Sequence, residues 1–407
     1  MSYTYTDEIK FAHTTNFDAF GRLRISEPFT LFDSSNRYRD NGLFATSTSG
    51  TASATFNSDQ GLVDLTIGSA SGDGVIRETY RVFAYQPGKS LLVMNTFVMA
   101  SPQIDLRQRV GYFGTNNGFY LELDGSDAYL VERSSVSGSI TNTRIAQSSW
   151  NVDPMDGTGP SGETLDLTKS QILWCDLEWL GVGSVRTGFV IDGKFITCHV
   201  FHHANLIAST YITTARLPIR YEIENTSAVA SGSTLKQICS TVISEGGYDL
   251  RGSEGSVTVP ITSSINLTTA GTYYPIVSIR LKAANLDAIA IPTGIALLPD
   301  NTGNYSYRIV TGGTTTGGSW TSAGADSSVE YNITGTSHAG GIASQHGFFA
   351  QTNQASSNIE LARDDIFRYQ LERNSFTSTP LEFTLLVASS SNGDDVYGSM
   401  DWQETTR

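Results

Sequence analysis

The chain has 407 residues, of which 16% are charged, and a formal net charge of -14 at pH 7. Because an acidic chain repels phosphate, we expect no nucleic-acid partner; basic clusters such as Arg22/Arg24 and Arg107/Arg109 are small. The charged fraction lies below the roughly 25% of ordinary soluble proteins. Ser, Thr, Gly and Asn take the place of charge, which indicates short strands joined by tight turns. The length predicts two or three domains with a sizeable core.

The first predicted element is an extended segment over residues 17–34, with the sequence FDAFGRLRISEPFTLFDS. Basic and apolar residues alternate at 22–25, which is a strand period with one charged face, and Pro28 then removes a backbone donor. Four phenylalanines are too many for a solvated tail, so we expect the segment to be buried. It is either a first strand that covers the chain's own core or an arm that docks on another subunit. The expected docking residues are Phe17, Phe20, Arg22, Leu23, Arg24, Phe29 and Phe32.

The stretch AFGRLRISEPFTLFDS at residues 19–34 resembles an N-terminal signature of virion structural proteins of tailed bacteriophages. The likeness is close within this stretch and weaker as far as about residue 250. It implies a location in the virion after synthesis in the host cytoplasm, with other virion proteins as partners. It also implies a homo-oligomer, a trimer by analogy with virion fibres and spikes. We therefore expect residues 1–50 to form a docking arm and the first strands.

Residues 51–247 are predicted to form a β-sandwich. In IRYEIENT, Ile219, Tyr221 and Ile223 alternate with charged residues, which is typical of a strand with one buried face. Asp192-Gly193 lies between two alternating runs and predicts a hairpin with a type I′ turn. Many such strands without an amphipathic helix indicate a two-sheet sandwich or jelly roll. Their order resembles a concanavalin-like lectin sandwich, and Gly246-Gly247 marks its end.

Residues 248–407 are predicted to form a second β-sandwich, whose strands are separated by Gly/Ser/Thr-rich stretches. We expect long exposed loops at 156–165 and 311–346, where recognition commonly occurs. Tyr397 and Trp402 lie in a polar C-terminal segment and indicate that it is tied down. The predicted fold class is therefore all-β, with an extended N-terminal arm followed by two β-sandwich domains of jelly-roll type, the first concanavalin-like.

The best carboxylate pair for catalysis is Asp176 and Glu178. In a strand, residues i and i+2 share a face about 6.5 to 7 Å apart, a spacing compatible with glycoside hydrolysis. One group of glycoside hydrolases on the concanavalin-like fold carries Glu-x-Asp-x-Glu, or Glu-x-Asp-x-x-Glu, on one strand. Trp174 stands here where that pattern has its first acidic residue. We therefore predict no catalytic residues and no enzyme.

Cofactor and metal sites are not predicted either. His199 and His203 would lie about 13 Å apart on a strand, too far to share a metal directly, so these histidines and His202 are expected to be ordinary hydrogen-bonded residues. The loops at 155–166 and 300–306 offer oxygen ligands for Ca²⁺ but lack EF-hand spacing. The thiols Cys175, Cys198 and Cys239 are expected to be free and buried.

Two function classes fit these patterns. The first is a non-enzymatic structural component of a tailed-phage virion (a tail, neck, fibre or capsid-surface protein) that assembles through its N-terminal arm. The alternative is a receptor-recognition fibre or tailspike that binds, and in one version cleaves, a host-surface glycan. In that case Trp150, Trp320 or Trp402 would stack on sugar rings. The polar, acidic start and the lack of a long apolar run predict neither a signal peptide nor membrane insertion.

Overall fold

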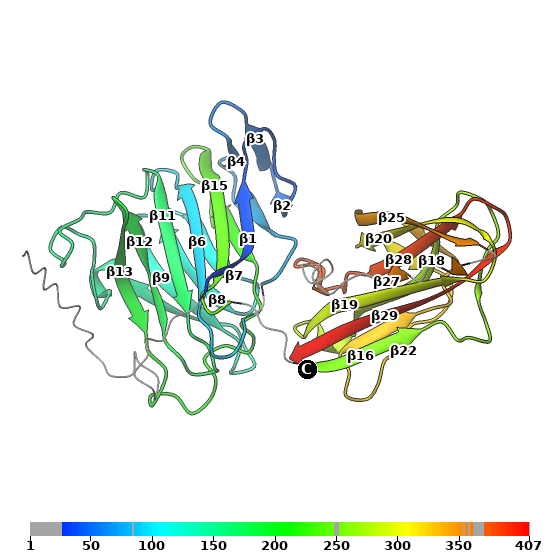
Figure 1. Ribbon diagram of the computed structural model, residues 1–407. Coiled ribbons are helices and arrows are strands. Elements are labelled where there is room, and N and C mark those ends of the chain that lie inside the picture. The colour runs from blue at the N-terminus through cyan, green and yellow to red at the C-terminus, as the bar shows by residue number, and fades with distance from the viewer. Residues whose placement is uncertain are drawn as a thin grey trace, which may run out of the picture.

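The computed structural model describes residues 27–83, 85–247, 252–352, 355–356, 359–360 and 370–406. In these residues the regular structure is antiparallel β, apart from two 3₁₀ turns, η2 (Gln147–Ser149) and η3 (Ala283–Asn285). Figure 1 shows two groups of packed sheets, one built from β1–β15 and the other from β16–β29. Each group has its own buried hydrophobic cluster. The prediction of an all-β protein with β-sandwiches is confirmed. Residues 248–251, at the expected domain boundary, lie outside the described part.

The first sandwich consists of an eight-stranded and a seven-stranded sheet. The eight-stranded sheet has the order β13-β12-β11-β6-β15-β4-β3, with β1 also paired to β15. Its strands are β1 (Phe29–Ser35), β3 (Ser53–Asn57), β4 (Leu62–Ile67), β6 (Leu91–Val98), β11 (Gln171–Leu177), β12 (Val185–Ile191), β13 (Lys194–Phe201) and β15 (Ser233–Ser244). The seven-stranded sheet has the order β10-β9-β8-β7-β14-β5-β2. Its strands are β2 (Phe44–Ser49), β5 (Gly74–Thr79), β7 (Leu106–Phe113), β8 (Gly118–Asp124), β9 (Asp127–Ser134), β10 (Thr141–Ala146) and β14 (Ile219–Asn225).

The predicted hairpin at Asp192-Gly193 is confirmed. These two residues connect β12 and β13, with Ile191 opposite Lys194. Their φ angles are 50° and 75°, and a type I′ turn needs positive φ at both central positions. A glycine at the second position adopts this conformation without steric cost, so the turn sets the register of the hairpin.

The segment after the predicted arm is the strand β1, which pairs with the second half of β15. Phe32 is 6% exposed and lies in the first core, with its ring centroid 6.1 Å from that of Phe44 and 4.9 Å from that of Phe83. Its assignment as a docking residue is therefore corrected, because the pleat of β1 turns it toward the chain's own core. Phe29 begins the strand and is 40% exposed. The other five expected docking residues lie outside the described part: Phe17, Phe20, Arg22, Leu23 and Arg24.

The second sandwich combines a five-stranded sheet, a seven-stranded sheet and a small pair, β21-β24. The five-stranded sheet has the order β16-β29-β19-β27, with β17 also paired to β29, and the larger one has the order β22-β23-β18-β28-β20-β25-β26. The first set of bounds is β16 (Ser253–Thr258), β17 (Ile265–Leu267), β19 (Ile289–Pro299), β27 (Ile359–Glu360) and β29 (Asp394–Thr406). The remaining bounds are β18 (Tyr274–Leu281), β20 (Gly303–Thr311), β21 (Thr314–Thr316), β22 (Thr321–Ser322), β23 (Val329–Asn332), β24 (Ser337–Ala339), β25 (Ile342–Thr352), β26 (Ala355–Ser356) and β28 (Phe383–Ser389).

Two expectations for this half are refined by the strand pairing. The C-terminal segment is tied down as predicted, because β29 pairs with β16, β17 and β19 and buries Trp402. The expected long loop at 311–346 is wrong as a single loop. It contains β21 to β24 and the start of β25, because its short Thr-containing runs pair in register, as at Thr315 opposite His338.

Truncating Phe32 tests the core role of β1. We expect Phe32→Ala to lower the free energy of unfolding of the first sandwich by about 3–5 kcal/mol, the usual cost of removing a buried phenylalanine ring. Tyr38→Ala is the matched control, since Tyr38 is 87% exposed and should change it by no more than about 0.5 kcal/mol. Urea unfolding followed by circular dichroism measures both. Equal losses in the two variants would contradict the assignment of β1 to the core.

Candidate functional site

The outer face of the seven-stranded sheet carries alternating charges. Because side chains alternate along a strand, Ile219, Tyr221 and Ile223 of β14 are fully buried in the core, and Arg220, Glu222 and Glu224 face outward. On the neighbouring strands the residues that share this face are Arg107 and Arg109 of β7, Glu122 of β8 and Glu78 of β5. The register places Glu222 opposite Arg109, Arg109 opposite Glu122, Glu224 opposite Arg107 and Arg220 opposite Glu78.

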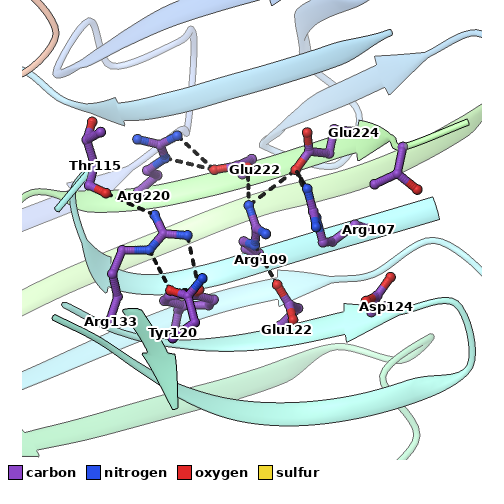
Figure 2. A network of polar contacts seen from close by, with 12 residues as sticks. Arg107, Arg109, Thr115, Tyr120, Glu122, Asp124, Arg133, Arg220, Glu222 and Glu224 are labelled. Carbon is purple, nitrogen blue, oxygen red and sulfur yellow. Dashed lines mark hydrogen bonds and ion pairs between the residues drawn. The ribbon is translucent and has the colours of Figure 1, made fainter. Parts of the chain in front are cut away.

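This register creates a connected set of ion pairs, the charge network, shown in Figure 2. Arg109 is at its centre: its Nε donates to Glu122 at 2.6 Å, and its Nη1 donates to Glu222 at 2.6 Å and to Glu224 at 3.2 Å. Arg220 Nη2 lies 2.8 Å from the second carboxylate oxygen of Glu222. The network thus joins three neighbouring strands, β8, β7 and β14, through buried charge-assisted hydrogen bonds.

The network favours the ionised form of Glu222. Burial opposes ionisation of Glu222, but the charges of Arg220 and Arg109 outweigh it and lower its pKa below the usual value. Burial likewise disfavours the charged form of Arg109, yet Glu222 and Glu122 raise its pKa. Glu78 differs, because burial raises its pKa despite the nearby charge of Arg220. A general acid needs a carboxyl group that carries a proton near the working pH, and Glu222 is held away from that state.

A further buried arginine, Arg133, extends this face toward a turn. Arg133 of β9 donates from Nη2 to the Tyr120 hydroxyl at 3.1 Å and from Nη1 to the Gly114 carbonyl at 3.2 Å. Its guanidinium lies over the ring of Tyr120, 5.0 Å from the centroid. Figure 2 shows Arg133 between Tyr120 and Thr115. Arg133 therefore fixes the turn at 114–117, which connects β7 to β8.

The predicted carboxylate pair is on the other sheet. Asp176 of β11 is buried and forms an ion pair with Arg186 of β12. Burial raises the pKa of Asp176, against the opposing charge of Arg186. Glu178 lies beyond the end of the strand, is exposed and accepts a hydrogen bond from the Ser184 N–H at 3.4 Å. The two carboxyl groups thus have different surroundings, and Asp176 already has a cationic partner.

His199 and His203 are hydrogen-bonded, as predicted, whereas His202 is exposed. His199 Nδ1 accepts from the Asn151 N–H at 3.2 Å, and burial lowers its pKa to about 4. His203 is enclosed by two acceptors: its Nδ1 is 2.6 Å from the Gly183 carbonyl, and its Nε2 is 2.7 Å from a Glu132 oxygen. Burial disfavours the charged ring, but these two bonds raise the pKa of His203. Among the described residues, no group of three or more histidine, cysteine, aspartate or glutamate side chains is arranged to hold a metal ion.

The expected free thiols are present, with Cys175 and Cys198 buried and Cys239 partly buried. Burial raises the pKa of the Cys198 thiol to about 12, so it is unreactive at neutral pH. No helix in the described part of the chain is long and apolar enough to cross a membrane.

Two of the three tryptophans expected to stack on sugars are core residues, which corrects that expectation. Trp150 and Trp402 are 5% and 1% exposed, and each donates its indole N–H within the protein, to the Ile145 carbonyl and to Glu404 respectively. Trp320 is partly buried, and the Arg280 guanidinium lies 3.8 Å from its ring centroid. The burial of Trp402 depends on the pairing of β29 with the distant strands β16 and β19, which a local pattern does not reveal.

No family model matches the chain, and no curated protein matches it. Among solved structures, it is similar to a β-glucanase of Bacillus licheniformis, with 13% identity and a TM-score of 0.35, over 52% of this chain and 96% of that one. It is similar to the carbohydrate recognition domain of Emp47p, with 11% identity and a TM-score of 0.34, over 53% and 96%. It is also similar to the CBM2 module of the evolved Dit of Lactobacillus casei BL23 phage J-1, with 6% identity and a TM-score of 0.34, over 56% and 100%.

Removing the central cation tests the charge network. We expect Arg109→Gln to lower the free energy of unfolding by about 3 kcal/mol, the low end for breaking a buried ion pair, because Arg144 and Arg220 still neighbour Glu122 and Glu222. Arg107→Gln, at a partly exposed pair with Glu224, should cost at most about 1 kcal/mol.

The pH dependence has a definite sign. A lowered folded pKa, as at Glu222, contributes stability above the unfolded pKa, and that contribution is lost as pH falls through the folded pKa. The difference between wild type and Arg109→Gln should therefore shrink in acid, and chemical denaturation across a pH series measures it. A difference that is constant with pH, or no larger than that of Arg107→Gln, would contradict the network.

The His203 pair predicts the opposite pH trend. A raised folded pKa contributes stability below the usual histidine value of 6.5, and this contribution is lost as pH rises through the folded pKa. We expect His203→Gln to cost about 1.5–3 kcal/mol, the usual value of hydrogen bonds to charged groups, at about pH 5.5 and clearly less at about pH 9. His202→Gln, at the exposed neighbouring residue, is the control. A loss that does not decrease with pH would show that His203 acts by packing alone.

Proposed function

We propose that this chain is a non-enzymatic structural component of a tailed-phage virion, joined to other virion proteins by the residues that precede β1. The observation that carries the proposal is the division of the signature at residues 19–34. Its second half, PFTLFDS, forms all of β1 except Ser35, and Phe32 of this strand lies in the first core. Its first half, AFGRLRIS, comes immediately before this anchored strand in the chain. The docking side chains are then Phe17, Phe20, Arg22, Leu23 and Arg24, together with Phe29, which is exposed at the start of β1.

The position of β1 supports a role in attachment. β15 pairs with β4 through residues 233–237 and with β1 through residues 239–244. The two strands therefore lie along the same side of β15, one after the other. Among the described residues, β1 pairs with no strand other than β15. An edge strand offers backbone donors and acceptors to an incoming strand. A docking segment joined to such a strand would be held by the sandwich itself.

The non-enzymatic part of the proposal rests on the ion pairs that the acidic residues form with arginines. The carboxylates at the centre of the outer face are each held by an arginine: Glu122 and Glu222 by Arg109, and Glu224 by Arg107. Asp176 is held by Arg186. Carboxylates neutralised in this way stabilise the sheet and are poorly suited to move protons. The proposal also includes a homo-oligomeric state and a location in the virion, both of which are implied by the resemblance of residues 19–34 to the virion-protein signature.

Deleting residues 1–26 tests the proposal. The truncated protein retains β1 and should keep the unfolding midpoint of the full-length protein, while its mass by light scattering should fall from an oligomer to a monomer. In full-length protein, Arg22→Glu with Arg24→Glu should weaken assembly in the same direction, by about tenfold or more.

Deletion of residues 1–35 is the contrasting variant, because it also removes β1 and should destabilise the first sandwich. This pair of deletions separates docking from folding. A protein that keeps its oligomeric mass without residues 1–26, or that is monomeric at full length, would overturn assembly through this segment.

A further inference from the structure

A cleft of about 630 Å³ lies where the two sandwiches meet. The first sandwich contributes the turn at 114–117, the segment 213–218 before β14, and the side chains of Tyr85 and Trp179. The second contributes residues 283–289, which include η3, and residues near Arg373. The volume falls within the range of about 300–1,000 Å³ typical of small-molecule sites, and domain interfaces are a preferred place for them.

Buried polar contacts hold the two sides of the cleft together. Arg216 is 3% exposed and donates across the interface to two backbone carbonyls, that of Ala288 and, at 2.8 Å, that of Leu371. Arg81 of the first sandwich forms an ion pair with Glu372 of the second. Because these donors and acceptors come from both sandwiches, the cleft is largely formed before a ligand arrives, which lowers the entropic cost of binding.

The wall from the first sandwich is also fixed. The amide of Asn117 donates to the Thr213 hydroxyl at 2.7 Å and accepts from the Thr213 N–H at 3.2 Å. This joins the turn at 114–117 to the segment 213–218. Arg133 holds the same turn through the Gly114 carbonyl, so the outer face of the sheet supports the wall of the cleft.

The charges that line the cleft are compensated within the protein. Arg373 Nε lies 3.1 Å from an Asp287 oxygen, and Glu78 is 3.4 Å from Arg220. The guanidinium of Arg216 donates to the two carbonyls that it bridges. The lining thus has two carboxylates, Glu78 and Asp287, and two guanidinium groups. A phosphate, a carboxylate or a metal ion would gain little here, because binding it would require breaking these pairs.

The remaining groups of the lining are neutral. Thr115, Asn116 and Ser378 are exposed in the cleft and present two hydroxyls and an amide. Trp179 is partly buried and meets Tyr85 edge to face at 5.9 Å between ring centroids. An amide and hydroxyls provide both donors and acceptors, and an aromatic ring offers an apolar surface. Together they match a ligand that has many hydroxyl groups, apolar C–H faces and no net charge.

We propose that this cleft binds a short neutral oligosaccharide. Asn116, Thr115 and Ser378 hydrogen-bond its hydroxyl groups, and Trp179 contacts a sugar ring. The inference goes beyond the structural role, since it uses only residues of the two sandwiches and does not depend on residues 1–26. It also places sugar recognition at a tryptophan other than Trp150, Trp320 and Trp402.

Blocking the cleft without removing a contact gives the sharpest test. Ala284 is an exposed residue of η3 that lines the cleft, so Ala284→Trp should fill it. Ala325→Trp is the matched control, since Ala325 is also exposed in the second sandwich but does not line the cleft. The probes are the neutral hexasaccharides maltohexaose, cellohexaose, chitohexaose and mannohexaose, with the anionic hexagalacturonate for comparison. Isothermal titration calorimetry measures affinity, and quenching of tryptophan fluorescence gives a second readout.

We expect at least one neutral probe to bind, with affinity reduced tenfold or more by Ala284→Trp and unchanged by Ala325→Trp. Asn116→Ala, a milder change at an exposed turn, should weaken binding of the same probe about threefold to tenfold. This variant replaces Ala284→Trp in the test if Ala284→Trp fails to fold. Protein lacking residues 1–26 should bind with full affinity even if it is monomeric, so this test and the assembly test fail separately. The inference is overturned if no neutral probe binds more tightly than about 1 mM, if the blocking variants leave binding intact, or if only hexagalacturonate binds.

Discussion

The guanidinium of Arg109, shared by carboxylates from β8 and β14, is the interaction on which the first sandwich depends. Burying a carboxylate costs several kcal/mol unless a cation and hydrogen bonds compensate it. The register of β8, β7 and β14 provides this compensation by placing Arg109 opposite both Glu122 and Glu222. A slip of one residue would turn these charges into the hydrophobic core, so the ion pairs and the core specify the same register.

The pairing of charges on the outer face of the seven-stranded sheet also indicates which groups are available to bind a ligand. Arginines and carboxylates that satisfy one another are unavailable to a ligand unless the pairs break. Arg133 and Arg220 extend the arrangement to the edge of the cleft, where they hold Gly114 and Glu78. The exposed side chains there are neutral, as at Asn116 and Thr115. The charged groups therefore build a support, and the neutral groups that it positions form the surface suited to a ligand.

Local patterns were sufficient for the features that depend on neighbouring residues. Alternation in IRYEIEN predicted the buried side chains of β14, and Asp192-Gly193 predicted a turn whose φ angles are both positive. The sequence also marked Arg107 and Arg109 as a basic pair, but it did not identify their partners. Glu222 lies 113 residues after Arg109, and only the strand order brings them together. The cleft was hidden for the same reason, because its walls come from several separate segments of the two sandwiches.

The proposed attachment and the cleft are linked by packed contacts. Phe32 of β1 packs on Phe83, and the Phe83 N–H donates to the Leu217 carbonyl at 3.0 Å. The next residue back along the chain is Arg216, which bridges to Leu371 of the second sandwich. Each step of this path is a buried contact, and a conformational switch would require an element with two arrangements. The path instead favours rigid presentation: if the chain is attached through the segment before β1, as proposed, the anchored strand would fix the position of the cleft relative to the docking partner.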